Sequence, residues 1–325
     1  MRGAARGPGP PDRVRRVNIV ADRVRVTVPA SAGNLGPGFD ALGMALGVVD
    51  TIEVSLLARP DVVVEVEGEG AGRVPADESH LFVRAFREAF GMFGSERPGL
   101  EIRAVNAIPH GQGLGSSAAT VVSAFAAVRA VLGEPEELSL DAILRLATKF
   151  EGHPDNAAPA IYGGAVVCWQ DADGAHASPL AVAPEIQTAV LIPHGVVPTA
   201  EARAALPEAV PHRDAAFNAS RAALLVHALA GHSELLLAAT EDRLHQGYRA
   251  SHMPQAVAMI ERLRGDGLAA VVSGAGPSVL VIGTDLAASG LETGPLAWAD
   301  GVGGDTWRAV LTTERVPGVA VEVLG

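Results

Sequence analysis

Cysteine and lysine are almost absent from this sequence of 325 residues. The single cysteine, Cys168, excludes an intramolecular disulfide. It stands in the strand-like segment GGAVVCW, where we expect a buried side chain that is not a nucleophile. The single lysine, Lys149, follows no glycine-rich loop. A phosphate loop of the G-x-x-x-x-G-K-[ST] type needs a lysine directly after its glycines, so the sequence excludes that class of nucleotide site.

Long apolar runs and an excess of positive charge are missing as well. No stretch of eighteen apolar residues lacks a polar interruption, which argues against a transmembrane helix. Residues 1–22 are rich in arginine, glycine and proline, without the apolar core of a secretory signal or the serines of a transit peptide. We expect a disordered extension there, or an upstream start-site artefact. The net charge of -12 disfavours nucleic acid or an anionic membrane as the main partner. We expect a cytoplasmic protein.

Apolar periodicity predicts strands mixed with helices. Strands are predicted over 24–29, 51–57, 61–68, 100–108, 186–193, 307–314 and 319–325, with a strand, a turn and a strand over 269–283. We expect 51–57 and 61–68 to form a hairpin. Helices are predicted over 77–94 (capped by Asp77 or Ser79), 116–132, 139–150 (capped by Ser139), 214–230, 233–244 and 254–265 or 254–267. The polar, turn-rich stretch 170–184 predicts a domain boundary.

The most informative stretch is PHGQGLGSSAAT, between the strand predicted over 100–108 and the helix predicted over 116–132. Its glycines, Gly111, Gly113 and Gly115, permit a tight turn whose N–H groups approach a ligand, and Ser116 or Ser117 stands where a helix N-cap is expected. A helix N-terminus favours anions, so this stretch predicts a phosphate site. The alternative is a glycine-rich turn without a ligand. It is not a dinucleotide fingerprint, because a serine replaces the third glycine of G-x-G-x-x-G.

This stretch, P-x-G-x-G-L-G-S-S-A-A, resembles the ATP loop of the galactokinase, homoserine kinase, mevalonate kinase and phosphomevalonate kinase (GHMP) superfamily. Three further motifs agree in the expected order: VPASAGNLGPGFDALGMAL (28–46), EGHPDNAAPAIYGG (151–164), which is similar to the homoserine kinase branch, and VVSGAGPSVLVIG (271–283). The resemblance spans about residues 23 to 325. It implies an α+β fold of two domains after the extension over 1–22. An N-terminal ATP-loop domain, like domain 2 of ribosomal protein S5, is expected over 23–175, and a ferredoxin-like domain over 176–325, with the site in the cleft between them.

The resemblance implies ATP-dependent phosphorylation of the side-chain hydroxyl of L-homoserine to O-phospho-L-homoserine, in threonine biosynthesis. It places adenine near His80, at the start of the helix predicted over 77–94. ATP is expected to contact Pro109, His110, Gly111, Gln112, Gly113, Leu114, Gly115, Ser116, Ser117, Ala118 and Ala119. Mg²⁺ is expected on Ser117 and Glu151, because one carboxylate with substrate phosphates suits that ion; a lone histidine in EGHPDN makes a structural zinc site a poor alternative.

The same resemblance places six residues at the substrate, namely Asn34, Asp40, His153, Asn156, Arg203 and Arg249. A carboxylate such as Asp40 suits an ammonium group, and an arginine suits a carboxylate because its fork binds both oxygens. Thr199 and Arg203 are four residues apart on a predicted helix and share a face. We count Thr199, Arg203 and Asp155 as candidate catalytic residues. Asp155 matches an aspartate that relatives use, and we expect it to orient the substrate more than to abstract a proton, because a loose transition state needs little activation of the nucleophile.

Two other functions stay open at this point. One is a different kinase of the superfamily, such as a mevalonate kinase, although EGHPDN and the pair Thr199 and Arg203 argue against it. The other is a nucleotide-binding regulator without catalysis. For each motif there is also an ordinary structural explanation: a Gly/Asn/Asp loop around Asn34, a capped turn at Glu151, and a surface position for Arg203. A homodimer is an option that the resemblance leaves open.

Overall fold

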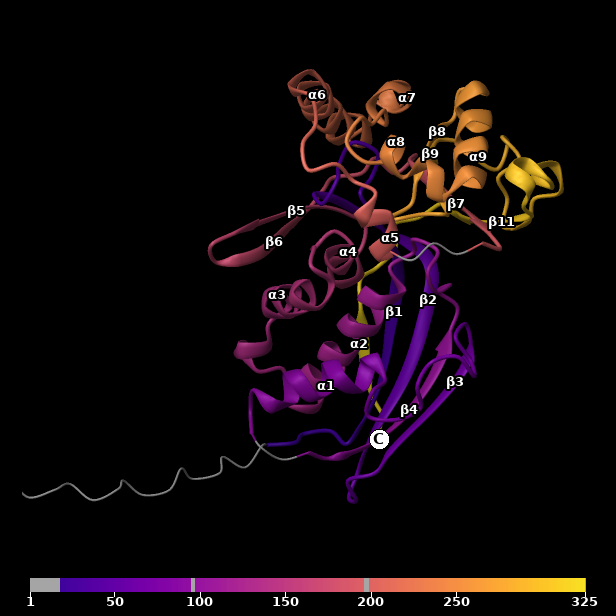
Figure 1. Ribbon diagram of the computed structural model, residues 1–325. Helices are drawn as coiled ribbons and strands as arrows, with labels where there is room; N and C mark the ends of the chain where they lie inside the picture. Colours follow the sequence, from indigo (N-terminus) through magenta and orange to yellow (C-terminus); the bar gives the residue numbers. More distant parts are fainter. Residues whose placement is uncertain (1–17, 95–96, 196–198, 325) are drawn as a thin grey trace, which may run out of the picture.

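The computed structural model describes residues 18–94, 97–195 and 199–324. Two sheets, each with helices beside it, make up the fold (Figure 1). Most of the predicted N-terminal extension lies outside the described residues. None of the described helices is both long and apolar enough to cross a membrane.

The first sheet has seven strands in the order β12-β1-β2-β4-β3, with β5 paired to β2 and β6 paired to β5. The strands are β1 (Arg23–Gly33), β2 (Leu42–Leu57), β3 (Val62–Gly68), β4 (Gly99–Asn106), β5 (Ala165–Asp171), β6 (Gly174–Pro179) and β12 (Ala320–Val323). Four helices lie to one side of its long strands (Figure 1), namely α1 (Leu81–Gly91), α2 (Ser116–Val131), α3 (Leu140–Glu151) and α4 (Ala157–Tyr162), with the short 3₁₀ turn η1 (Glu136–Leu138). The other face carries cross-strand ion pairs such as Arg25 with Glu53, so it faces solvent.

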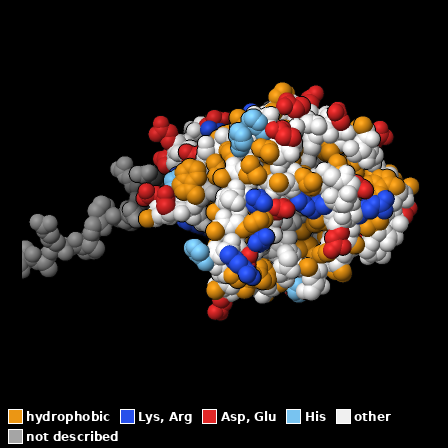
Figure 2. All heavy atoms as spheres, turned by 90° about the horizontal axis from the view of Figure 1, so that it is seen from above, with side chains coloured by type: hydrophobic (Ala, Val, Ile, Leu, Met, Phe, Trp, Pro, Cys, Tyr) orange, Lys and Arg blue, Asp and Glu red, His pale blue; other side chains and the backbone are white. Residues whose placement is uncertain are grey.

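The second sheet has five strands in the order β10-β11-β7-β9-β8. They are β7 (Gln187–Pro193), β8 (Ala269–Val272), β9 (Val279–Gly283), β10 (Gly294–Pro295) and β11 (Trp307–Thr312). Its helices are α5 (Thr199–Ala204), α6 (His212–Leu229), α7 (Leu236–Ala239), α8 (Gln246–Arg249) and α9 (Pro254–Gly265), with 3₁₀ turns η2 (Ser233–Leu235), η3 (Ala250–His252), η4 (Ala297–Ala299) and η5 (Val302–Gly304). On the face over this half, arginines alternate with acidic and apolar side chains (Figure 2), and some form ion pairs, such as Arg221 with Glu241.

The helix that follows the glycine-rich loop is the centre of the first core. The side chains of α2 are almost entirely buried, because the helix has apolar residues on nearly every face. It packs against α1, α3 and β1. A helix fixed on so many sides holds its N-terminus in one place, which suits a site that must orient a ligand.

The α+β fold class is confirmed, but four local predictions are wrong. The segments 51–57 and 61–68 do not form a hairpin: β4 lies between them, antiparallel to β2 and parallel to β3. The inward side chains of β4, such as Ile102, are fully buried, whereas β3 is half-exposed and takes the edge. The helix predicted over 233–244 is only the turn η2 followed by the four residues of α7.

Helix caps account for the other errors. The first helix begins at Leu81, and its N-cap is His80, whose ring accepts a hydrogen bond from the N–H of Phe82. Asp77 instead closes a turn onto Ser79. The prediction for Ser139 is confirmed, since its hydroxyl accepts from the N–H of Ala142.

The last strand returns to the start of the chain. β12 pairs antiparallel with β1, with Val323 opposite Val24. The predicted division between residues 175 and 176 falls inside β6 (Gly174–Pro179), which belongs to the first sheet, as β12 does. The division into two domains stays a prediction.

Candidate active site

The loop between β4 and α2 has the left-handed turns that its glycines permit. Gly111, Gly113 and Gly115 have φ angles of 69°, 73° and 67°. The N-cap of α2 is Gly115, not Ser116 or Ser117 as predicted, and no side chain caps the helix. A Cβ at Gly115 would lie 2.1 Å from the hydroxyl of Ser31, so only glycine fits this position. The first N–H groups of α2 are thus left without a side-chain cap, which is the arrangement that binds anions.

The loop is also held from the second half of the chain. The hydroxyl of Ser273 donates to the carbonyl of Gly113 at 2.8 Å, and the amide of Gln112 donates to the carbonyl of Pro193 at 3.1 Å. A Cβ on Gly113 would lie 2.1 Å from the carbonyl oxygen of Ser273. The glycine-rich loop and the turn between β8 and β9 therefore form one closely packed unit.

Ser117 and Glu151 meet at the N-terminus of α2. The serine hydroxyl donates to Oε1 of Glu151 at 2.5 Å. Glu151 is the last residue of α3. Burial raises the pKa of the Glu151 carboxyl, and the hydrogen bond from Ser117 opposes that rise only in part. Two oxygen ligands beside an anion-binding helix end are a donor set that fits Mg²⁺ held together with phosphates.

The turn after α3 places three polar side chains under the loop. Asp155 is fully buried, its Oδ1 is hydrogen-bonded to Nδ1 of His153, and its Oδ2 has no partner among the described residues. Burial disfavours the charged imidazole, but the hydrogen bond and the charge of Asp155 outweigh it, so the pKa of His153 is raised. Asn156 accepts a hydrogen bond from the hydroxyl of Ser31 at 3.1 Å.

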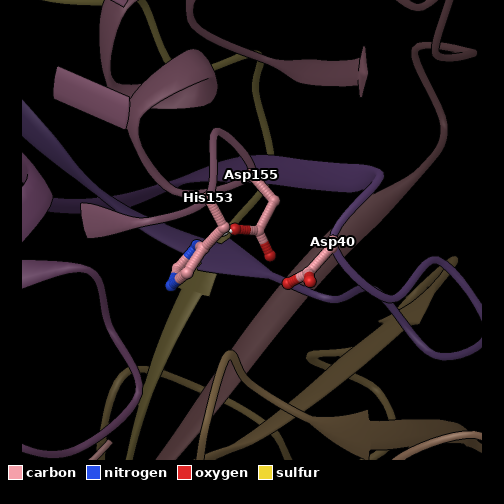
Figure 3. Close-up of side chains that lie close together, drawn as sticks. All are labelled: Asp40, His153 and Asp155. Atoms are coloured by element: carbon pink, nitrogen blue, oxygen red, sulfur yellow. Dashed lines mark hydrogen bonds and ion pairs between the residues drawn. The ribbon is translucent and has the colours of Figure 1, made fainter. Parts of the chain in front are cut away.

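Asp40 reaches this group from a different segment. Ligand atoms of Asp40, His153 and Asp155 lie within 4.8 Å of one another, with the Asp155 carboxylate between the other two side chains (Figure 3). Asp40 lies in the loop between β1 and β2, where Asn34 accepts from its N–H at 2.9 Å. Both Asn34 and Asp40 have positive φ angles, 56° and 53°, which asparagine and aspartate tolerate better than other side chains do.

Two arginines complete the group. Arg203, in α5, donates two hydrogen bonds to the carboxylate of Asp40. Arg249, at the end of α8, is almost fully buried, and its Nε donates to the carbonyl of Ala202 at 3.0 Å. Its Nη1 is 3.4 Å from the carbonyl of Gly274.

One cavity of about 100 Å³ joins most of the predicted site residues. Its lining includes Asn34, His153, Asn156, Arg203, Arg249, Glu151 and the loop residues Pro109, Gly111, Gly113, Leu114, Gly115, Ser116 and Ser117. Ala118 and Ala119 are fully buried in the core, and the side chain of Gln112 is turned toward Pro193. Thr199 is the first residue of α5, but its side chain lies outside the described residues.

A second cavity, of about 280 Å³, shares Gly111, Ser116 and Ser117 with the first. Its lining also includes His80, His110, Pro75, Asn106 and Asp50. Burial lowers the pKa of both His80 and His110, which favours their neutral forms. The sequence pointed to His80 and to the loop residues His110, Gly111, Ser116 and Ser117, whereas Pro75, Asn106 and Asp50 lie in segments that carry no local motif.

Comparison with known proteins agrees with this geometry. The model of the GHMP kinases N-terminal domain matches residues 80–164, and that of the GHMP kinases C-terminal domain matches residues 220–291. A homoserine kinase of Clavibacter michiganensis is 52% identical over 263 residues, 81% of this chain and 83% of that protein. A homoserine kinase of Streptomyces coelicolor is 51% identical over 81% of this chain and 85% of that protein. The crystal structure of a homoserine kinase from Cytophaga hutchinsonii matches with a TM-score of 0.80 and 25% identity, covering 94% of this chain and 99% of that one. The chain therefore belongs to the homoserine kinases of the GHMP kinase family.

Proposed function

We propose that this protein transfers the γ-phosphoryl group of ATP to the side-chain hydroxyl of L-homoserine. The new bond joins the homoserine oxygen to phosphorus, the bond between the β,γ-bridging oxygen and the γ-phosphorus breaks, and the hydroxyl proton is released. The products are O-phospho-L-homoserine and ADP. The observation that carries the proposal is the cavity in which the uncapped N-terminus of α2 lies beside Arg203, Arg249 and His153, the last of which is hydrogen-bonded to the buried Asp155.

The nucleotide half of the proposal rests on the glycine-rich loop and the second cavity. The phosphates lie against the N–H groups of the loop and the start of α2, where the helix dipole favours negative charge. The adenine fits the neighbouring cavity beside His80 and His110. Ser117 and Glu151 are the residues that would hold Mg²⁺. When bound, the ion neutralises negative charge on the phosphates.

The substrate half rests on the mixed charges of the first cavity. Arg203 and Arg249 line the cavity and offer donors for the α-carboxylate. Asp40 is not in the lining but is hydrogen-bonded to Arg203, and it offers an acceptor for the α-ammonium group. Asn34, His153 and Asn156 supply further polar contacts around the same space. With its α-carboxylate and its α-ammonium group both bound, homoserine is held so that its side-chain hydroxyl faces the phosphate loop. In phosphoryl transfer such positioning is most of what a protein contributes.

The two rival functions fit less well. A mevalonate-type substrate has no ammonium group and leaves Asp40 without a role. A regulator without catalysis has no need for the Ser117–Glu151 pair beside the phosphate loop. The relatives at about half identity named homoserine kinases favour the proposed substrate over both.

The experiment is a coupled assay of ADP release with L-homoserine, L-serine, L-threonine and mevalonate as acceptors, with and without excess EDTA. We expect rapid turnover with L-homoserine only, a phosphomonoester product in ³¹P NMR, and loss of activity in EDTA. Turnover with mevalonate and none with L-homoserine would overturn the proposed substrate. Undiminished turnover in EDTA would reject the Mg²⁺ site.

A cytoplasmic location, the absence of nucleic acid and membrane partners, and a homodimer stay predictions. Gel filtration with light scattering measures the oligomeric state directly.

A further inference from the structure

His245, which directly precedes α8, connects two parts of the substrate site. Its side chain is fully buried. Nε2 lies 2.7 Å from the carbonyl oxygen of Gly36, and Nδ1 lies 3.2 Å from Nη1 of Arg249. A carbonyl only accepts hydrogen bonds and a guanidinium only donates them. The proton of the neutral ring is therefore on Nε2, and Nδ1 accepts from Arg249.

The surroundings keep this ring neutral. Burial lowers the pKa of His245, and the nearby charge of Asp242 opposes that effect only in part. The Asp242 carboxylate is itself occupied at the start of α8, where it accepts from the N–H groups of Leu244, His245 and Gln246 at 2.9, 3.0 and 2.8 Å. A neutral imidazole can accept a hydrogen bond from an arginine, whereas a protonated imidazole cannot.

The ring of Phe39 makes a further contact with both His245 and Arg249. The ring of Phe39 stacks on His245, with centroids 5.4 Å apart. The guanidinium carbons of Arg249 and Arg203 lie 5.4 and 5.6 Å from the centre of that ring. Phe39 directly precedes Asp40, and Gly36 lies in the same loop. In Figure 1 this indigo loop reaches into the second half of the molecule, among its helices.

Arg249 depends on His245 for its orientation. Its Nε is held by the carbonyl of Ala202, and its Nη1 has only the contact with His245 and the longer one, 3.4 Å, with Gly274. Nη2 has no hydrogen-bond partner within the described part of the chain, and Arg249 lines the cavity. Without the acceptor on His245, the planar guanidinium can turn about the Cγ–Cδ and Cδ–Nε bonds of its side chain and point Nη2 in the wrong direction.

We propose that His245 is a positioning residue that holds the carboxylate-binding Arg249 and the Gly36–Asp40 loop in one fixed arrangement for the amino-acid substrate. The inference rests on the proposed function, because it takes Arg249 and Asp40 as contacts of the substrate. His245 does not touch the reacting atoms. Its effect is therefore expected in the affinity for L-homoserine, and only weakly in the affinity for ATP or in kcat.

Two substitutions separate the two hydrogen bonds of His245. In His245→Asn, the amide oxygen can take the place of Nδ1 and still accept from Arg249, but the shorter side chain cannot reach Gly36. In His245→Gln, the amide nitrogen can take the place of Nε2 and still donate to Gly36, but nothing replaces Nδ1. A hydrogen bond to a charged group contributes about 1.5–3 kcal/mol, or roughly ten- to a hundredfold in affinity. We expect His245→Gln to raise the KM for L-homoserine by at least about tenfold on that scale, and His245→Asn to raise it less.

The experiment is steady-state kinetics of both variants with each substrate, together with thermal unfolding. His212→Gln, an exposed histidine of α6, is the matched control and should leave both KM values unchanged. Equal KM values for L-homoserine in wild type and His245→Gln, or parallel increases for L-homoserine and ATP, would overturn the inference. A wild-type protein without turnover on L-homoserine would instead overturn the proposed function, so the two failures are distinguishable.

Phe39→Leu is a second test that leaves both hydrogen bonds of His245 in place, and it decides the matter if a histidine variant does not fold. Loss of the stacking contact should raise the KM for L-homoserine by about threefold, the scale of an aromatic pair of 0.5–1.5 kcal/mol, with the KM for ATP unchanged. An unaltered KM for L-homoserine in this variant would count against the inference.

Discussion

The carboxylate of Asp40 accepts two hydrogen bonds from the guanidinium of Arg203, at 2.8 and 3.3 Å. The two residues come from opposite halves of the chain, one from the loop between β1 and β2 and the other from α5. Both side chains are partly exposed, and an exposed ion pair contributes little stability, about 0–1 kcal/mol. The pair can therefore open at low cost. We infer that a zwitterionic substrate exchanges with it, offering an ammonium group to Asp40 and a carboxylate to Arg203.

The arginines should therefore control the affinity for homoserine. In Arg203→Ala and Arg249→Ala we expect the KM for L-homoserine to rise by about ten- to a hundredfold, the effect of a lost hydrogen bond to a charged group, with a smaller change in the KM for ATP. Arg249→Ala should also lower the melting temperature, because this buried side chain holds the carbonyl of Ala202.

Arg262→Ala is the control for the arginine variants. Arg262 lies on the exposed side of α9, paired with Asp266, and its loss should change neither KM. Equal losses of ATP and homoserine affinity in the Arg203 and Arg249 variants would mean that these arginines do not bind the substrate.

Because the phosphate loop is closely packed, adding one methyl group at Gly113 should strongly reduce activity. In Gly113→Ala the new Cβ would lie 2.1 Å from the carbonyl oxygen of Ser273, and alanine is strained at a φ of 73°. The loop must shift, and a misplacement of about 1 Å in a site can cost about a hundredfold in rate. We expect a loss of that order in kcat/KM for ATP, measured by coupled ADP release. Gly91→Ala, at the end of α1 with no atom within 4 Å of the added Cβ, should behave like the wild type.

Asp50 gives a prediction for stability against pH. Its carboxyl accepts hydrogen bonds from the N–H groups of Ala107 and Ile108 at the base of the phosphate loop. Burial raises its pKa to about 6, and the two N–H groups oppose the shift. A raised pKa means that the folded state prefers the protonated acid. The resulting stability is fully present below the unfolded pKa, near 3.8, and is lost as the pH rises through about 6.

Asp50→Asn tests this prediction, since asparagine keeps an acceptor for both N–H groups and does not titrate. Relative to wild type, the variant should gain free energy of unfolding between pH 4 and pH 7, by up to about 3 kcal/mol from a shift of roughly two pKa units. Urea unfolding of both proteins at four pH values measures the difference. A difference that stays constant with pH would show that Asp50 does not titrate in this range.

Local motifs in the sequence predicted the family, the phosphate loop and the mixed α+β fold, because each depends on residues close together in the chain. The resemblance assigned Ser117 and Glu151 to one Mg²⁺ site, and the structure places their side chains in contact. The order of β2, β4 and β3 was not predicted, because the pairing of strands that are distant in the chain produces no pattern in the local sequence. The contact of His245 with Gly36 joins residues 209 apart. Asp50 and Asn106 line the second cavity only because β2 and β4 are neighbours.

Asp155 is the remaining question of mechanism. It is fully buried, with Oδ1 on His153 and Oδ2 free of hydrogen bonds among the described residues. Oδ2 can accept either the hydroxyl proton of the substrate or a hydrogen bond that merely aims that hydroxyl. A general base contributes about a hundred- to ten-thousandfold in rate, whereas a loose transition state of phosphoryl transfer asks little of a base.

We predict that Asp155 orients the hydroxyl more than it removes the proton. Asp155→Asn keeps the shape of the side chain and one acceptor oxygen but loses the charge. With Mg²⁺ and ATP saturating, kcat should fall by less than about a hundredfold, below the range of a required base, and its pH profile should keep the wild-type shape. A fall beyond about a thousandfold, together with loss of an acidic limb present in the wild type, would establish Asp155 as the base. A large fall with an unchanged pH profile and weakened homoserine affinity would instead place its effect in substrate binding, because a base is not needed for the ground-state complex to form.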